Sequence, residues 1–186
     1  MAKRTYSFEL ALSQQEQADY FRLRKEIFCD EQGMFEQHDR DSIDNQAYPI
    51  VAISHHPATT NPDTPQSVVG VVRIYEEEPR LWYGGRLGVH PDFRRVGRIG
   101  KGLIQKAVTT ANTWGCDRFL ATVQLQNVRF FTRLHWNSLK EIEILGHPHH
   151  LMEADLAFYP PTDQPRPTLP LQPVAPRQHA SRQQVA

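Results

Sequence analysis

The stretch from Val68 to Ala111 constrains the fold more than any other part of the sequence. Residues 68–75 and 81–89 are rich in valine, leucine and tyrosine, and the charged turn 76–80 separates them, so they are predicted to be adjacent antiparallel strands. From about Ile99 to Trp114, apolar residues recur at spacings of three and four, which predicts an amphipathic helix. This pattern is typical of a sheet with a helix packed on it.

The same reasoning assigns the rest of the chain. Ser13 and Glu16 form the S-x-x-E pattern of a helix N-terminus, and helically spaced apolar residues follow as far as Phe28. The order predicts one α+β domain with a single mixed, mostly antiparallel sheet of about six or seven strands and helices on both faces. The remaining predicted elements are strands at 49–53, 119–123, 139–145 and 151–156, a proline-rich hairpin loop at 55–66, and a short helix at 128–134.

Charge and cysteine content limit the classes of function. The 21 lysines and arginines balance the 21 aspartates and glutamates, so no net charge draws the chain to nucleic acid or to an anionic membrane. Cys29 and Cys116 do not make a disulfide framework, and the nine histidines show no metal-ligand spacing with them. We therefore expect no metal site. No apolar run has the length of a membrane span or a signal peptide, so we expect a cytoplasmic protein.

The composition changes at Pro160. Prolines and glutamines dominate from there on, and large apolar residues become rare. Such a segment buries too little apolar surface to offset the entropy of ordering it. We therefore expect a folded domain at 1–159 and a proline-rich disordered tail at 160–186; a docking site for another protein is the alternative for the tail.

The segment Arg86–Gly102 carries the strongest chemical signal. It is predicted to hold the end of a strand, a glycine-rich turn and the start of the long helix, with the cations Arg94, Arg95, Arg98 and Lys101 around the turn. A helix start offers free N–H groups, glycines allow close approach, and arginine binds phosphate with two nitrogens. The segment therefore predicts a phosphate site. A solvated helix cap or a nucleic-acid contact would give a similar pattern, whereas the P-loop and dinucleotide fingerprints are absent.

This segment resembles the coenzyme A loop of the GNAT superfamily of N-acyltransferases. The family pattern Q/R-x-x-G-x-G/A follows a strand that ends in a phrase like R-L-x-V-x-P, and the matching residues here are 95–100 and 86–91. Arg98 stands where the first glycine of the pattern usually lies. The resemblance implies either that Arg98 contacts phosphate directly or that the loop runs one residue differently.

Three further segments resemble GNAT motifs, in the family's order. Residues 24–32 are similar to R-x-x-[VI]-F-x-x-E-Q, residues 126–136 to N-x-x-x-F-Y-x-x-x-G-F, and residues 148–152 to P-H-x-x-M. These similarities point to a bacterial subfamily found in gene clusters with a nitrilase. The first helix and the acidic loop 39–44 are similar to those of acyl-homoserine-lactone synthases, which share the fold.

The resemblance implies that acetyl-CoA is the acyl donor and that its pantetheine arm lies where two central strands separate. A backbone N–H of the segment 87–89 would polarise the thioester carbonyl. The coenzyme A contacts implied in this way are Leu87, Gly88, Val89, Arg94, Arg95, Val96, Gly97, Arg98, Ile99, Gly100, Lys101, Asn127 and Phe131.

Catalysis requires a base, because an alkyl amine with a pKa of about 10.4 must lose a proton before it attacks. Many GNAT relatives place a glutamate or histidine on the central strand, where this chain has Tyr83 and Gly85. The catalytic candidates are Tyr83, Glu31 and His149, with Glu153 or a chain of waters as alternatives. A structural role is the alternative for His149, as a hydrogen-bonded turn residue, and for Glu31, as a solvated helix end.

The implied function is transfer of an acyl group, acetyl in the first instance, from acyl-CoA to an amine of a small molecule in a ternary complex. Phe131 replaces the tyrosine that often serves as general acid, so a non-catalytic acyl-CoA sensor is a second hypothesis. An acyl-homoserine-lactone-like synthase is a third. Asp39, Asp41 and Asp44 would either attract a cationic amine or form a solvated turn, and a homodimer is compatible with the sequence.

Overall fold

A seven-stranded sheet forms the centre of the computed structural model, which describes residues 4–55 and 67–171. The strand order is β1-β2-β3-β4-β5-β7-β6, and every neighbouring pair is antiparallel except β4 and β5. This arrangement confirms the predicted α+β fold with a mixed, mostly antiparallel sheet. The strands are β1 (Thr5–Leu10), β2 (Tyr48–His55), β3 (Ser67–Glu78), β4 (Leu81–Val89), β5 (Arg118–Gln124), β6 (Trp136–Ile144) and β7 (His147–Ala154).

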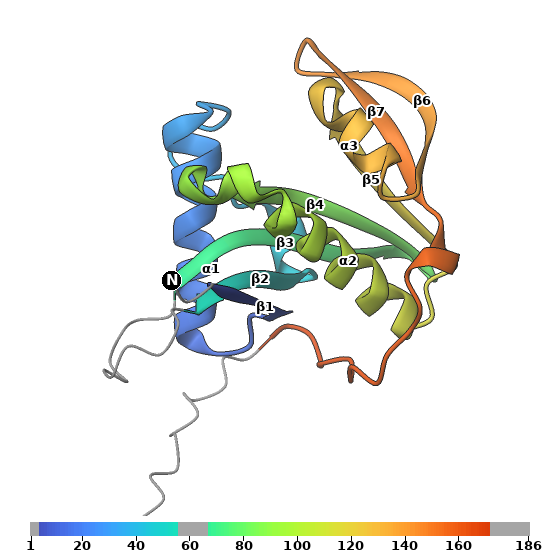
Figure 1. The fold of residues 1–186 in the computed structure, drawn as a ribbon, viewed down its shortest axis with the longest axis horizontal. Helices are drawn as coiled ribbons and strands as arrows, with labels where there is room; N and C mark the ends of the chain where they lie inside the picture. The colour runs from blue at the N-terminus through green and yellow to red at the C-terminus, as the bar shows by residue number, and fades with distance from the viewer. Residues whose placement is uncertain (1–3, 56–66, 172–186) are drawn as a thin grey trace, which may run out of the picture.

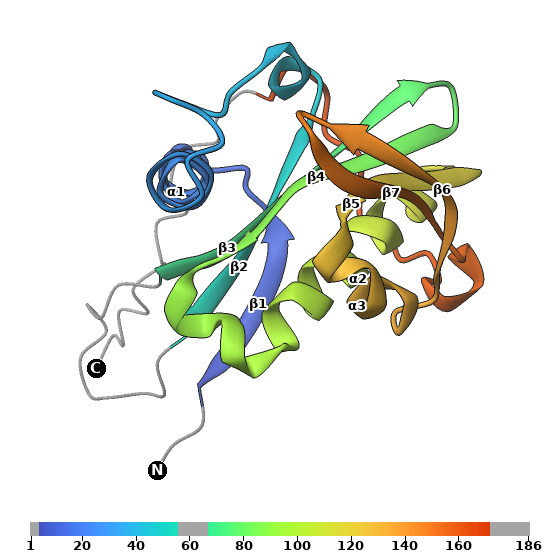
Figure 2. The ribbon, with the colours of Figure 1, turned by 90° about the horizontal axis from the view of Figure 1, so that it is seen from above.

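Helices cover both faces of the sheet (Figures 1 and 2). On one face lies α1 (Gln14–Lys25), which begins at the predicted capping box and continues into a wider helical turn, η1 (Glu26–Glu31). On the other face lies α2 (Arg98–Thr113). The short helix α3 (Val128–Thr132) follows β5 and contacts β6.

Two apolar layers hold the helices to the sheet. Leu103 and Val108 of α2 are fully buried in the larger layer, where Trp82 of β4 and Ile74 of β3 also lie. The smaller layer joins α1 and η1 to the opposite face through residues such as Tyr20, Leu23 and Ile27. The helical spacing of these apolar residues is therefore explained by burial of one helix face against the strands.

β1, the edge strand before α1, is not among the predicted strands. It has no continuous apolar run, but Tyr6, Phe8 and Leu10 alternate with polar residues and pack on the larger apolar layer. It is held by antiparallel pairing with β2, from Thr5 opposite His55 to Leu10 opposite Ile50. The predicted hairpin loop lies outside the described residues from residue 56 to residue 66.

β4 and β5 run side by side only over the first part of their length. Parallel pairing joins four residue pairs, from Leu81 opposite Arg118 to Gly84 opposite Ala121. Beyond these pairs, β4 stays paired with β3, and β5 stays paired with β7. The two strands diverge as Figure 1 shows, so the facing edges of residues 85–89 and 122–124 are not paired with each other.

A bulge in β4 lies where the strands separate. Val71 of β3 pairs with Gly88 and Arg73 pairs with Gly85, so β4 holds one extra residue between these pairs. Arg86 has a φ of 54°, a left-handed conformation that is uncommon for a residue with a side chain. The extra residue turns the Arg86 side chain toward α1, the side that Gly85 also faces. The bulge thus lies directly after two adjacent glycines, Gly84 and Gly85.

The first part of the proline-rich segment packs on the domain, in contrast to the expected disorder from Pro160 onward. The guanidinium of Arg166 lies 4.8 Å from the ring centroid of Trp82, and Trp114 Nε1 donates a 2.8 Å hydrogen bond to a carbonyl of the segment. Composition does not reveal these contacts, because they come from Arg166, from backbone groups and from only two apolar side chains, Leu169 and Leu171, which pack on the larger layer. Residues 172–186 of the expected tail lie outside the described residues.

Candidate active site

The split between β4 and β5 opens into a cavity of about 340 Å³. Strands β3, β4, β5 and β7 contribute to its lining, as do η1, the residues that follow η1, and α3. The cavity therefore lies between the two halves of the sheet and beneath the end of η1. Its polar and tyrosine side chains are Gln32, Arg73, Tyr75, Tyr83, Arg86, Thr122, Gln124, Asn127 and His149.

The start of α2 lies beside the diverging strand ends. A 3-10 turn, η3 (Pro91–Val96), connects it to β4, and a Cβ at Gly100 would lie 3.6 Å from the ring of Phe130, in the helix that follows β5. Gly97 caps α2 with a φ of 61°, and Arg98 is the first helical residue. The left-handed residue thus comes one position before Arg98.

This helix start has the character of an anion site. The first N–H groups of a helix lack intrahelical acceptors, and here these belong to residues 98–100, whereas the N–H of Gly97 bonds to the carbonyl of residue 94 at 3.3 Å. The side chains of Arg95, Arg98 and Lys101 are exposed around it. Free N–H groups and three cations at one helix end favour phosphate binding.

Arg94 differs from the other cations of the turn because it is already paired. Its two terminal nitrogens lie 2.5 and 2.6 Å from the carboxylate oxygens of Glu31, and its Nε donates to the carbonyl of Val89 at 2.8 Å. The hydrogen bonds from Arg94 hold the pKa of Glu31 below its ordinary value. This geometry argues against Glu31 as the base, because a carboxylate held by a guanidinium takes up a proton less readily.

The other implied coenzyme A contacts divide into backbone and side-chain groups. The Ile99 side chain is buried against Gly70 in the core, so only its backbone faces the helix start. Leu87 lines the cavity from the separated part of β4. Asn127 and Phe131 line it from the opposite side, and the Phe131 ring packs edge-on against Trp136 at 5.1 Å.

Three more of the implied contacts are Gly88, Val89 and Val96, at the end of β4 and of η3. A Cβ at Gly88 would come within 2.9 Å of Ile27, so this glycine lets η1 pack closely on β4. Val89 ends β4, and its carbonyl is the one that Arg94 engages. Val96 ends η3, directly before Gly97.

His149 is 7% exposed and lines the cavity from β7. Its Nδ1 lies 2.8 Å from the carbonyl oxygen of His147. Because a carbonyl oxygen can only accept a hydrogen bond, Nδ1 must carry the hydrogen, and Nε2 of the neutral ring is then left as an acceptor. His149 pairs with Gln124 across the strands, so the two residues lie on the same face of the sheet.

The remaining base candidates occupy different positions. Tyr83 lines the cavity and stacks on Tyr75, with ring centroids 5.8 Å apart. Glu153 is paired with Arg118, at 2.8 Å between Oε1 and Nε, and does not line the cavity. Of the candidates from the sequence, the structure therefore brings Tyr83 and His149 to the cavity and leaves Glu31 and Glu153 in ion pairs.

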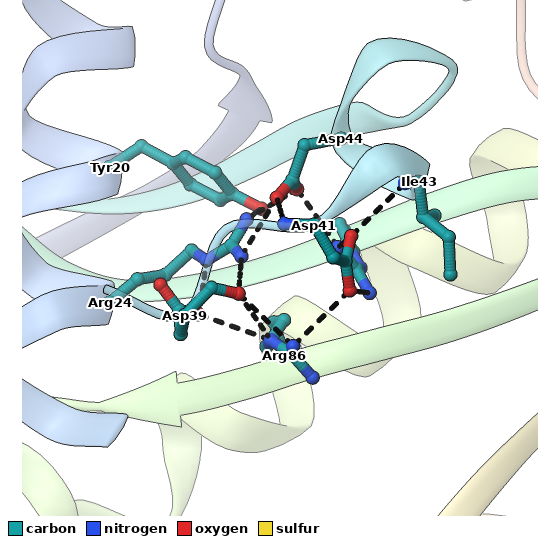
Figure 3. Close-up of polar contacts among 8 residues, drawn as sticks. Tyr20, Arg24, Asp39, Asp41, Ile43, Asp44 and Arg86 are labelled. Atoms are coloured by element: carbon teal, nitrogen blue, oxygen red, sulfur yellow. Dashed lines mark hydrogen bonds and ion pairs between the residues drawn. The ribbon is translucent and has the colours of Figure 1, made fainter. Parts of the chain in front are cut away.

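The acidic loop is neither a solvated turn nor a free anionic patch, which corrects both expectations. Asp39 is 2% exposed and lies 2.7 Å from Arg24, while Asp41 and Asp44 both bond to Arg73, each within 3.0 Å (Figure 3). Burial raises the pKa of Asp44, but hydrogen bonds from Arg24 outweigh it and hold that pKa below its ordinary value. The three carboxylates are thus committed to arginines.

Arg73 and Arg86 line the cavity but were not among the predicted site residues. Arg73 is 4% exposed and stands in a strand that is otherwise apolar at its centre, V-V-G-V-V-R-I-Y. A lone charge in a buried strand is itself a signal, because burying an unpaired charge costs several kcal/mol. Arg86 could be found only from the structure, since the bulge reverses the direction of its side chain.

Three further observations concern the cysteines, the possible metal ligands and the helix lengths of the described residues. Cys29 and Cys116 are buried free thiols. In the part of the chain that the structure describes, no group of three histidine, cysteine or acidic residues is arranged to hold a metal ion. Among those same residues, no helix has the length and hydrophobicity needed to cross a bilayer.

Comparison with known proteins decides the family. The model of the Acetyltransferase (GNAT) family matches residues 13–136, which is more than half of the chain. The chain belongs to this family. No curated protein sequence matches it.

Solved structures similar to this GNAT protein share its fold at low sequence identity. Escherichia coli ElaA is 19% identical with a TM-score of 0.64, and the match covers 82% of this chain and 100% of that one. An acyl-CoA N-acyltransferase from Pseudomonas aeruginosa is 16% identical with a TM-score of 0.61, covering 82% and 99%. The CoA-dependent acyl-homoserine lactone synthase BjaI is 16% identical with a TM-score of 0.60, covering 81% and 82%.

Proposed function

We propose that this GNAT protein is an N-acyltransferase that moves an acyl group from acyl-CoA to the amine of a small molecule. The observation that carries the proposal is the split between β4 and β5 with the start of α2 beside it. Coenzyme A has phosphates at one end and amide groups along its arm. A helix start rich in N–H groups and cations suits the first, and unpaired strand edges suit the second.

The residues around the split would each contact a different part of the donor. The N–H groups of 98–100 and the side chains of Arg95, Arg98 and Lys101 would hold the phosphates. The edge of β4 at 85–89 would bond to the pantetheine amides, and one of its N–H groups would stabilise negative charge on the thioester oxygen. Asn127 would bond to the arm from the other side, where Phe131 would pack against it.

His149 is the base in this proposal. Its Nε2 would accept the proton of the amine as the N–C bond forms and the C–S bond breaks. The thiolate would then leave without much help, because an ordinary thiol has a pKa of about 8.5. The absence of a tyrosine at Phe131 is therefore compatible with turnover, and Tyr83 would line the acceptor side of the site.

Acetyl-CoA is the proposed donor. The cavity of about 340 Å³ must hold both the acyl end and the acceptor, which favours a short acyl group over a long chain. The bacterial subfamily with nitrilase-containing gene clusters, the cytoplasmic location and the homodimer stay predictions from the sequence.

Calorimetry and a thiol-release assay test the proposal together. Acetyl-CoA is expected to bind to the full chain, and acetyl-pantetheine, which lacks the nucleotide phosphates, is expected to bind much more weakly. Incubation of acetyl-CoA with a set of small amines is expected to release free thiol. A well-folded protein with no affinity for acetyl-CoA or for longer acyl-CoA would overturn the proposal, and binding without turnover on any amine would favour the acyl-CoA sensor.

A further inference from the structure

The cavity is lined by cationic side chains and by no acidic ones among the described residues. This bears on the acceptor of the proposed reaction. Arg73 and Arg86 line the side of the cavity that faces α1 and η1, and no aspartate or glutamate is among the described lining residues. A cationic acceptor such as a polyamine would meet guanidinium groups there. The lining instead suits an acceptor that carries an anionic group.

The pairing of the carboxylates leaves part of Arg86 unused. Its Nε and Nη2 bond to Asp39 and Asp41, at distances from 3.1 to 3.4 Å. Its Nη1 makes no hydrogen bond to the described residues, and Figure 3 shows one guanidinium nitrogen turned away from the carboxylates. Two N–H donors of a group that lines the cavity are therefore available to a ligand.

Arg73 adds positive charge directly beneath this point. Its two terminal nitrogens bond to Asp41 and Asp44, but its buried Nε has no hydrogen-bond partner among the described residues. That Nε lies 3.6 Å from the place where a Cβ of Gly85 would stand. Burial and the nearby Arg73 charge lower the pKa of Arg86, so an anion beside Arg86 would stabilise its charged form.

Aromatic side chains form the wall beside these arginines. Tyr75 and Tyr83 stack on the same face of the sheet, and Phe35 lies under Arg86, 4.7 Å from guanidinium carbon to ring centroid. His149 lies on the same face of the sheet as Tyr83. Its cross-strand partner Gln124 in β5 and Tyr83 in β4 each stand next to residues that pack on α2, so both side chains point to the opposite face. A ligand anion at Arg86 and an amine near His149 would thus share one small space.

We propose that the acceptor is a small amine that also carries a carboxylate, with an apolar or aromatic side chain, and that Arg86 binds the carboxylate. This inference rests on the proposed acyl transfer and adds the class of acceptor. The carboxylate would bond to Arg86 Nη1, the side chain would pack on Tyr75 and Tyr83, and the amine would face the thioester.

Three matched acceptors test the class without any mutation. Phenylalanine, phenylalaninamide and phenethylamine share the amine and the ring, but only the first carries a carboxylate. With acetyl-CoA as donor, phenylalanine is expected to react with a kcat/KM about tenfold or more above that of the other two, the usual effect of one charge-assisted hydrogen bond. Equal rates, or a preference for the two compounds without a carboxylate, would overturn the inference and leave acyl transfer intact.

An Arg86→Gln variant tests the residue. We expect kcat/KM for phenylalanine to fall about tenfold more than kcat/KM for phenylalaninamide, so the discrimination between them is lost. An equal fall for both would mean that Arg86 only holds the bulge. The control is Arg118→Gln, since Arg118 pairs with Glu153 and does not line the cavity.

Product binding gives a result even if turnover is slow or if Arg86→Gln folds poorly. In the presence of coenzyme A, N-acetylphenylalanine is expected to raise the melting temperature of the wild-type chain more than N-acetylphenylalaninamide does. Equal shifts would overturn the inference. If the wild-type chain did not bind coenzyme A at all, the proposed function would be overturned as well. Failure of the acceptor class and failure of the proposed function are therefore distinguishable.

Discussion

At the scale of single residues, hydrogen-bond partners separate the candidates that the sequence could only group together. Glu31, Glu153 and His149 all belong to residue types that can act as a base. Two of them are held in ion pairs with arginines, whereas the third has its Nδ1 fixed by a carbonyl and its Nε2 left as an acceptor at the cavity. The choice depends on partners that lie far away in the sequence, such as Arg94, 63 positions from Glu31.

Replacement of His149 by glutamine tests this assignment. We expect kcat to fall about 10²- to 10⁴-fold, the usual contribution of a positioned general base, while the affinity for acetyl-CoA stays the same because the proposal gives His149 no contact with coenzyme A. Steady-state kinetics with acceptor in excess and calorimetry with acetyl-CoA measure the two effects.

Glu153→Gln on the same strand is the matched control for His149. Its carboxylate pairs with Arg118 outside the cavity, so kcat is expected to stay within about twofold of the wild type. If His149→Gln kept full kcat, the base would have to be a water chain or another residue, and our assignment would be wrong.

At the scale of elements, the start of α2 shows which parts of a motif can be read from sequence. The strand, turn and helix of 86–102 are present as predicted, because glycine and apolar spacing report local backbone preferences. The pairing of Arg94 with Glu31 was not foreseen, because it depends on how η1 packs against the turn. Four cations in the sequence thus correspond to three that are available for phosphate.

Arg98→Ala is expected to lower the affinity for coenzyme A about tenfold at low salt, with a smaller loss at high salt. The comparison is a double variant, Arg94→Ala with Glu31→Gln, which removes one cation and one anion together. Since that pair is already satisfied internally, its removal is expected to change the affinity much less. Calorimetry at two salt concentrations measures both, and an equal or larger loss in the double variant would contradict the assignment.

At the scale of the whole molecule, the sequence predicts layers better than the contacts that join them. Strand and helix patterns gave the sheet and its two helical faces, because burial imposes a period on each element. β1 was missed because its signal is only a short alternation of three apolar residues, and the packing of 160–171 was missed because Arg166, backbone groups and only two leucines make its contacts. Both lie at the border of the domain, where few apolar side chains report the fold.

Another set of contacts that was not predicted is the ion-pair network of Arg24, Arg73 and Arg86 with three aspartates. It links α1, the acidic loop, β3 and the bulge of β4, so it couples the helix on one face to the strand edge of the active site. Arg24, Arg73 and Asp39 are buried in it, and removal of one partner would leave another uncompensated. Such losses typically cost about 3–5 kcal/mol.

This network predicts an acid-sensitive fold. The pKa values of Asp41 and Asp44 lie below their ordinary values in the folded protein because the hydrogen bonds from Arg73 and Arg24 outweigh the effect of burial. An unfolded aspartate has a pKa of about 3.9, so the stabilisation is complete above that pH and is lost as pH falls through the lower folded values. Denaturant unfolding at several pH values should therefore show the free energy of unfolding decreasing below about pH 4.

Asp44→Asn makes the prediction specific. At neutral pH we expect it to lower the free energy of unfolding by about 3 kcal/mol or more, and between about pH 4 and pH 2 we expect its curve to be flatter than that of the wild type, because one depressed carboxyl no longer titrates. Asp117→Asn, which removes an exposed pair with Arg80, should leave both the value and the slope nearly unchanged. If the two variants behaved alike, the network would contribute no more to the stability of the fold than an exposed ion pair does.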